Sequence, residues 1–417
     1  MKFTFSKYRK ADKTIEPLAE ETCLQVLSNV SPLLGRQEVR QIIKNSEAKD
    51  MHMMIEFLDK ALRHPDFIGD KGKVTYLLCR MTAETKRFPQ SYRLHSVKYS
   101  QSVVGEGGFA QVREGKWHGR TICLKLRRST DTPVMGNQAR IEKIFMKEFV
   151  MWAHFLHPNV LPFYGVILVK GEPASISPWM KHGNIRQYIQ AHPVVSRLPF
   201  ILDTLNGLAY LHKSGVVHGD IKGENVLISS DRRAVLTDFG LSKAATSTLA
   251  GFTQPGDSFS GRWSSPELIS GQADDEKAVR PTAEGDIWSL ACLIYEIMSR
   301  RLPYFQYGLV IQVMSAIKRK ELPIRPKQTQ KTEDTISDEI WRLLLLCWNF
   351  NPQERPTCRQ VLEIFRKLDH KYQEAAESAE MRIAAEERLK TRVHLDFNQV
   401  RKFLNDVSAQ LSVFEST

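Results

Sequence analysis

The sequence lacks the features that mark a secreted or membrane-spanning protein. Its six cysteines are isolated among 417 residues, with no Cys-x-x-Cys pair and no histidine cluster beside them. This pattern argues against a disulfide scaffold and against a structural zinc site. The basic N-terminus has no apolar segment of the kind that a secretory signal needs, and the strongest apolar run, residues 341–348, is far too short to cross a bilayer. We expect buried thiols, no membrane span and a cytoplasmic location.

Dense runs of a single charge are also missing. The chain has 59 Lys+Arg against 47 Asp+Glu, a formal net charge of +12, which raises the possibility of a nucleic-acid partner. However, no block of Lys and Arg is interleaved with aromatic residues, so we expect no nucleic acid. A content of 42% hydrophobic and 25% charged residues is typical of a globular protein with a substantial core.

The sequence has no GxxxxGK[ST] string, which excludes a P-loop, but it has another glycine-rich segment. Residues 104–112 read VGEGGFAQV, and glycines let the backbone approach a phosphate without a side chain in the way. A dinucleotide-binding turn is the rival interpretation, and such a turn must open a helix. Residues 111–117 look extended instead, and Gly115 and Gly119 would break a helix at once. The segment therefore predicts a cover over nucleotide phosphates.

The most informative segment is 218–240, which reads HGDIKGENVLISSDRRAVLTDFG. It places Asp220, Lys222 and Asn225 on one short loop and Asp238 in an Asp-Phe-Gly turn. Phosphoryl transfer needs a carboxylate to orient the attacking hydroxyl, oxygen ligands for a metal ion, and cations over the phosphates. The segment contains most of these groups.

This segment resembles the catalytic loop and metal-binding turn of eukaryotic protein kinases. Other family motifs occur in order along residues 98 to 369: the glycine-rich loop with Ala110 in place of the third glycine, the strand 121–126 with Lys125, the triplet 265–267, and the segments 286–289 and 351–356. Each motif alone is weak evidence, but coincidence is a poor explanation for the ordered set.

The resemblance implies an α+β, bilobal protein kinase fold, with a small β-rich N-lobe, a helical C-lobe and Mg-ATP as the phosphate donor. It implies that Asp220 is the catalytic base, that Lys222 neutralises the transferring phosphate, and that Lys125 contacts the α- and β-phosphates while paired with Glu148. Glu142 is a competitor for that pairing on the same helix. The implied Mg²⁺ ligands are Asn225 and Asp238. The implied nucleotide-binding residues are Gly105, Glu106, Gly107, Gly108, Val112, Lys125, Glu148, Trp179 and Met180.

Residues 157–165, Cys347-Trp348 and 355–357 resemble the tyrosine-kinase-like group, which includes Raf-like and receptor-interacting kinases. Members of that group mostly modify serine or threonine in protein substrates, and Lys222 agrees with this specificity. A pseudokinase scaffold, which binds partners or nucleotide without phosphotransfer, is the alternative, because Ala110, Cys123 and Gly219 depart from the family pattern.

The resemblance does not reach residues 1–95 or 370–417. In 1–95, apolar residues recur at three- and four-residue spacings, which predicts three or four helices, with breaks at Pro32, Gly35, 64–65, Gly69 and Gly72. The spacing of apolar residues in the tail, 370–417, predicts one long or two shorter helices.

Within the domain at 98–369, a further helix is expected from about Arg140, with one face formed by Phe145, Glu148, Phe149, Trp152 and Phe155 or Leu156. We expect 1–95 and the tail to regulate the domain at 98–369 or to dock protein partners.

Overall fold

The computed structural model describes residues 16–106, 110–127, 138–239, 261–270, 281–326, 335–391 and 393–414. The chain begins with four helices, α1 (Glu16–Val30), α2 (Arg36–Asn45), α3 (Ala48–Arg63) and α4 (Lys71–Thr85), here called the N-terminal block. Gly72 was expected to break a helix, but it lies in the first turn of α4. The reason is that the Asp70 side chain accepts a hydrogen bond from the Lys73 backbone N–H at 3.0 Å and starts the helix before the glycine.

The N-lobe is a five-stranded antiparallel sheet with the order β1-β2-β3-β5-β4. Its strands are β1 (Lys98–Glu106), β2 (Ala110–Trp117), β3 (Arg120–Arg127), β4 (Gly165–Val169) and β5 (Glu172–Pro178). Helix α5 (Gln138–Ala153) lies between β3 and β4 in sequence. It ends before Phe155 and Leu156, so these two residues are not on the helix as expected; the Phe155 N–H bonds the Trp152 carbonyl at 3.1 Å as the chain turns.

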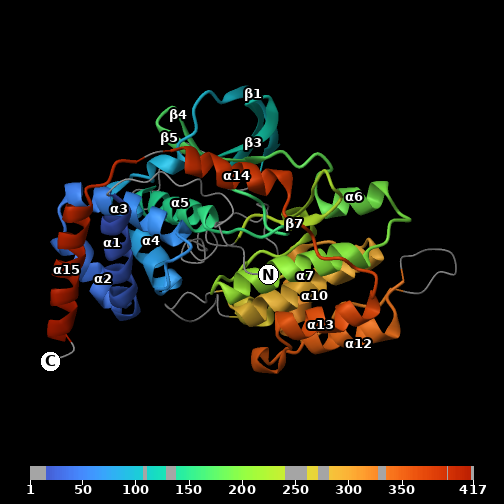
Figure 1. The fold of residues 1–417 in the computed structure, drawn as a ribbon. Coiled ribbons are helices and arrows are strands. Elements are labelled where there is room, and N and C mark those ends of the chain that lie inside the picture. The colour runs from blue at the N-terminus through green and yellow to red at the C-terminus, as the bar shows by residue number, and fades with distance from the viewer. Residues whose placement is uncertain are drawn as a thin grey trace.

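The C-lobe is mainly helical (Figure 1). Helix α10 is its central element, and almost every residue of α10 is buried. The two-stranded sheet β6-β7 follows the catalytic loop. The elements of the lobe are α6 (Ile185–Ala191), α7 (Leu198–Lys213), η4 (Gly223–Asn225), β6 (Val226–Ile228), β7 (Ala234–Leu236), α9 (Pro266–Ser270), α10 (Ala283–Ser299), α11 (Val310–Lys318), α12 (Asp338–Cys347), η6 (Pro352–Glu354) and α13 (Cys358–Leu368).

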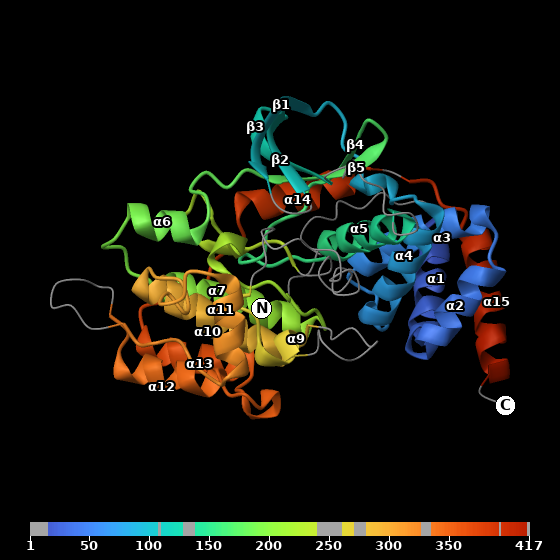
Figure 2. The ribbon, with the colours of Figure 1, turned by 180° about the vertical axis from the view of Figure 1, so that it is seen from behind.

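The tail forms two helices, α14 (Ala379–Lys390) and α15 (Phe397–Phe414), and runs back toward the start of the chain. Helix α14 packs on the N-lobe sheet, where Ala384 joins a cluster with Trp117 and Tyr164. Helix α15 lies beside α1, at the edge of the molecule in Figures 1 and 2. The Cys23 Sγ lies 3.4 Å from the Phe397 carbonyl oxygen. Helix α15 of the tail therefore packs against the helices of the N-terminal block.

A buried charged cluster joins the N-terminal block to the end of α5. The Asp59 carboxylate accepts hydrogen bonds from Arg63 at 2.6 Å and from the Ser91 hydroxyl at 2.8 Å, and one of its oxygens lies 3.3 Å from His154 Nε2. From the tail, the buried Arg388 guanidinium lies over the rings of Tyr92 and Phe163 and donates to the Phe163 carbonyl at 2.9 Å. We call Asp59, Arg63, Ser91, His154 and Arg388 the Asp59 cluster.

Two of the predicted features concern membrane spans and cysteines. Among the described residues, no helix is both long and apolar enough to span a bilayer. All six cysteines are free thiols, five of them buried and Cys123 half-buried, as expected.

Candidate active site

The catalytic loop is fixed to the central helix of the C-lobe by one carboxylate. The backbone N–H groups of His218 and Gly219 each donate to Asp286 at 2.8 Å, and His212 Nε2 lies 2.8 Å from the same carboxylate. Asp286 is 2% exposed, so these bonds are made in a low-dielectric environment that strengthens them. Asp286 therefore fixes the backbone of residues 218–219 to α10.

Gly219 adopts a backbone conformation that explains its residue type. Its φ is +73°, in the left-handed region where a Cβ clashes with the following carbonyl and costs roughly 1–2 kcal/mol. Glycine avoids that cost. The glycine at this position therefore avoids that backbone strain, but it offers no side-chain cation.

The three polar residues of the loop contact one another. The Asn225 amide Nδ2 donates to the Asp220 backbone carbonyl at 2.8 Å and to its carboxylate Oδ2 at 3.0 Å. The Lys222 Nζ lies 3.3 Å from the same Oδ2 and 3.4 Å from a carboxylate oxygen of Glu224. A carboxylate aligned by an amide and an ammonium is oriented for proton transfer from a substrate hydroxyl.

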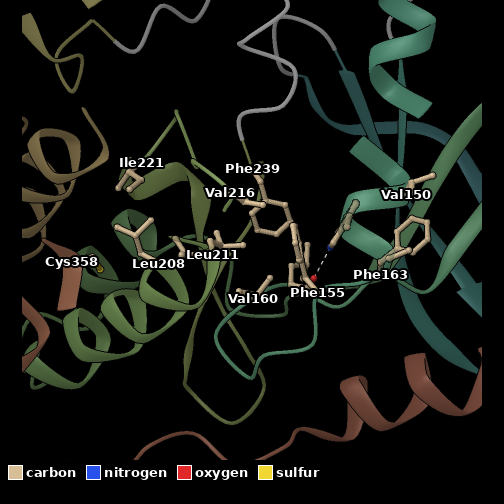
Figure 3. Packing of buried hydrophobic residues seen from close by; sticks show 14 of the residues in the cluster. Val150, Phe155, Val160, Phe163, Leu208, Leu211, Val216, Ile221, Phe239 and Cys358 are labelled. Atoms are coloured by element: carbon tan, nitrogen blue, oxygen red, sulfur yellow. Dashed lines mark hydrogen bonds between the residues drawn. The ribbon is translucent and has the colours of Figure 1, made fainter. Parts of the chain in front are cut away.

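The Asp-Phe-Gly turn is placed beside this loop. The Thr237 N–H bonds the Asn225 carbonyl at 3.0 Å, and Asp238 has φ +57°, a left-handed conformation that aspartate tolerates better than most residues. The buried Phe239 ring packs against Phe155 with ring centroids 5.6 Å apart (Figure 3). The ring thus anchors the turn in the core, while the carboxylate of Asp238 stays 44% exposed.

Lys125 contacts Asp238 in this structure, with Nζ 2.5 Å from Oδ1. The ion pair expected between Lys125 and Glu148 is not found among the described residues, and the buried Glu148 Oε2 has no hydrogen-bond partner there. Burial raises the pKa of Glu148 to about 7, Lys125 opposes this rise and Asp238 adds to it. Burial lowers the pKa of Lys125, but the carboxylates of Asp238 and Glu148 more than offset this and raise it. The ammonium thus contacts the more exposed of the two carboxylates, and Glu148 lies in a buried environment that disfavours its charged form.

The strands place the expected nucleotide-binding residues around the same point. Gly105 pairs with Val112 across β1 and β2, and Val112 pairs with Lys125 across β2 and β3. Glu106 ends β1, while Gly107 and Gly108 lie outside the described residues. Trp179 and Met180 follow β5 and are half-buried, in the connection to α6 between the lobes. Val112 and Lys125 are directly opposite each other on neighbouring antiparallel strands, so their side chains lie on the same face of the sheet.

Asn225 and Asp238 fit a magnesium ion chemically. Both can offer oxygen ligands, which Mg²⁺ prefers, and Mg²⁺ commonly takes one or two protein ligands and completes its shell with phosphates and water. The Asn225 Nδ2 is used by Asp220, which leaves the amide oxygen for a metal.

One part of the site was not anticipated from the sequence. The Glu296 carboxylate, 2% exposed on α10, accepts hydrogen bonds from the Gly223 N–H at 3.2 Å, from Trp263 Nε1 at 3.1 Å and from Arg186 Nε at 2.5 Å. Arg186 also bonds Glu224 at 2.8 Å. These contacts hold the loop segment that carries Lys222. The available signal was a lone glutamate inside the otherwise apolar run 290–297, since a buried carboxylate needs partners.

The chain is similar in sequence to known protein kinases. A family model described as protein tyrosine and serine/threonine kinase matches residues 99–365. The chain is 29% identical over 282 residues to drkB of Dictyostelium discoideum, described as a probable serine/threonine-protein kinase, covering 64% of this chain and 36% of that protein. It is 27% identical to the tyrosine-protein kinase Btk of Drosophila melanogaster, over 62% of this chain and 31% of Btk.

A third relative is similar in length to this chain. The serine/threonine/tyrosine-protein kinase HT1 of Arabidopsis thaliana is 26% identical over 279 residues, which are 65% of this chain and 67% of HT1. By contrast, the chain spans about a third of the length of drkB and Btk. The similarity covers the bilobal domain, and both serine/threonine and tyrosine specificities occur among these relatives.

Proposed function

Because this chain belongs to the protein tyrosine and serine/threonine kinase family, we propose that it is an active serine/threonine protein kinase that transfers the γ-phosphate of Mg-ATP to protein hydroxyl groups. The observation that carries the proposal is the loop geometry, in which Asn225 and Lys222 both contact the Asp220 carboxylate. A pseudokinase could dispense with this arrangement.

Each residue then has a defined task. Asp220 orients the substrate hydroxyl and receives its proton. Lys222, 3.3 Å from Asp220, places positive charge where the phosphoryl group crosses. Lys125 would neutralise the phosphates that stay on the nucleotide, with Glu148 as its expected partner. Asn225 and Asp238 would hold Mg²⁺, which would supply further positive charge at the phosphates.

The serine/threonine specificity and the tyrosine-kinase-like group are part of the proposal. Lys222 supports both, because the resemblance places a lysine at this position in serine/threonine kinases, and a tyrosine kinase must accommodate a longer phenol. The chain is also similar to HT1, whose name includes all three hydroxyl residues, so specificity needs a direct measurement.

Purified protein with Mg-ATP and a generic protein substrate should yield phosphoserine and phosphothreonine, detected by phosphoamino-acid analysis. The Asp220→Asn variant keeps the size and polarity of the side chain but removes the base, so it should lose roughly 100- to 10,000-fold in turnover. Mostly phosphotyrosine would contradict the specificity and the group. Equal, measurable turnover by the two proteins would contradict the role of Asp220, and no transfer by the wild-type protein would favour the pseudokinase scaffold.

Activation should be independent of a phosphate bound at the catalytic loop. The family pattern has an arginine before the catalytic aspartate, and that arginine grips a phosphorylated residue of the activation segment through bidentate hydrogen bonds; Gly219 has no such side chain. Replacing Thr253, Ser258 and Ser260 together by alanine should leave more than about a tenth of wild-type turnover. These three residues lie outside the described residues. A fall to the level of Asp220→Asn would contradict this prediction.

The flanking helices are proposed to regulate the domain. Helix α4 packs against α5, which carries Glu148, and Lys143 of α5 bonds Glu84 of α4 at 2.8 Å. A shift of the N-terminal block relative to the sheet would therefore move the helix that carries Glu148.

A further inference from the structure

A cavity of about 520 Å³ lies where three parts of the chain meet, and none of its lining residues belongs to the catalytic loop. Its walls come from α3, from the linker between α4 and β1, and from the end of α14 with the segment that follows it. We call it the junction cavity. Its volume is within the range of about 300–1,000 Å³ that is typical of small-molecule sites.

The lining combines basic and apolar side chains. The basic members are Arg87, Arg93, His52, His95 and His394. The apolar members are Met53, Ile55, Phe88, Val393 and Leu395. A wall of this kind can bind the anionic group of a ligand with one set of side chains and the remainder of the ligand with the other.

The two arginines are available to a ligand. Within the described part of the chain, neither the Arg87 nor the Arg93 guanidinium forms an ion pair or a side-chain hydrogen bond, although Arg93 lies close enough to Glu56 to lower the pKa of that carboxyl. Both residues are exposed, and both line the cavity. A guanidinium presents a planar set of donors that matches phosphate oxygens in pairs.

The two carboxylates of the lining compete weakly for these arginines. Glu387 is in an ion pair with Lys390 at 2.7 Å. Both oxygens of Glu56 accept from the Gln90 N–H, at 2.9 and 3.1 Å. Burial raises the pKa of Glu56 to about 7, with opposing contributions from that N–H and from Arg63 and Arg93. Near neutral pH this carboxyl therefore carries its charge only part of the time.

We propose that the junction cavity binds a small organic phosphate, with Arg87 and Arg93 holding the phosphate and the apolar residues contacting the organic part. Inorganic phosphate alone would fill a small fraction of the volume, so the ligand is a phosphate ester of metabolite size. This site is separate from the proposed nucleotide site and does not depend on phosphotransfer.

A bound ligand would also reach α5. The Phe88 ring lines the cavity and packs against Phe149 with centroids 5.8 Å apart, and Phe149 directly follows Glu148 in sequence. Occupation of the cavity would thereby fix the linker against the helix that carries Glu148.

The test is calorimetric titration of the full chain with fructose 1,6-bisphosphate and ribose 5-phosphate, with unphosphorylated fructose as the reference. Wild-type protein should bind the sugar phosphates and not fructose. The double variant Arg87→Gln/Arg93→Gln should bind about a hundredfold more weakly, because two charge-assisted hydrogen-bonded contacts are lost. The variant Arg87→Lys/Arg93→Lys should keep part of the affinity.

The matched control is Arg342→Gln/Arg382→Gln, which removes the same charge from exposed positions outside the cavity and should bind as wild type does. Vesicles of phosphatidylcholine containing phosphatidic acid distinguish a lipid headgroup from a soluble ester: arginine-dependent binding to vesicles alone would assign the phosphate to lipid and overturn the metabolite proposal. No binding of either sugar phosphate at millimolar concentrations, or equal losses in the cavity variant and its control, would also overturn it.

Discussion

Replacing Lys125 by methionine, or Asp238 by asparagine, should reduce phosphotransfer by roughly a thousandfold or more while the fold is retained. Each change removes a charge that is placed for the transition state, where a preorganised charge has its largest effect. The side chains of Lys125 and Asp238 are 28% and 44% exposed and contact each other at 2.5 Å. Their loss therefore leaves no large apolar cavity, and the unfolding temperature should change little.

The measurement is single-turnover transfer to a serine- or threonine-containing substrate, alongside thermal unfolding of each variant. Lys116→Met, at an exposed position of β2, and Asp231→Asn, in the exposed turn between β6 and β7, are the controls with the same chemical changes. Near-normal turnover in Lys125→Met or Asp238→Asn would mean that the site is assigned wrongly, whereas no transfer by the wild-type protein would favour the pseudokinase scaffold.

Replacing Asp59 by alanine should lower the free energy of unfolding by about 3–5 kcal/mol, since removing one partner leaves the other buried charges of the Asp59 cluster uncompensated. Asp59 is 1% exposed and bonds Arg63 and Ser91 at 2.6 and 2.8 Å. Denaturant unfolding followed by circular dichroism measures the change. Asp66→Ala, at an aspartate of the same block that is 70% exposed, is the control and should cost less than about 1 kcal/mol.

The same carboxylate predicts a pH dependence. Burial raises the pKa of Asp59, but Arg63, His154 and Ser91 together lower it well below its ordinary value. A carboxyl whose pKa is lower in the folded chain adds stability above the unfolded value of about 3.9, and that stability is lost as the pH falls below it. Wild-type protein should therefore lose stability more steeply than Asp59→Asn between about pH 5 and pH 3. Parallel stability curves would show that Asp59 is not ionised in the cluster.

The sequence predicted the parts of the site whose chemistry is local. Asp220, Lys222 and Asn225 lie within six residues of one another, so their spacing already constrains their geometry. The strand pairing of Val112 with Lys125 could also be expected from two short strands joined by a turn at Gly119. The fold class and the kinase family were predictable for the same reason, because each motif occupies one continuous segment.

Long-range choices between partners were not predictable. Sequence spacing favoured Glu148 as the partner of Lys125, but it carries no information on the depth of burial, which decides whether Glu148 or Asp238 holds the ammonium. Nor could it place Arg388, whose side chain is buried against Tyr92 and Phe163. A charged helix such as 379–390 ordinarily faces solvent, and its burial follows only from where the tail returns.

That return has a consequence for biosynthesis. The contact between Cys23 and Phe397 joins residues 374 positions apart, and α15 packs along α1. While the ribosome is still translating the bilobal domain, the apolar surface of α1 that α15 will cover has no partner from its own chain. Closing so distant a contact is slow, and an uncovered apolar surface favours aggregation during the delay. We therefore infer that nascent chains which end before residue 397 depend on chaperones more heavily than the finished chain does.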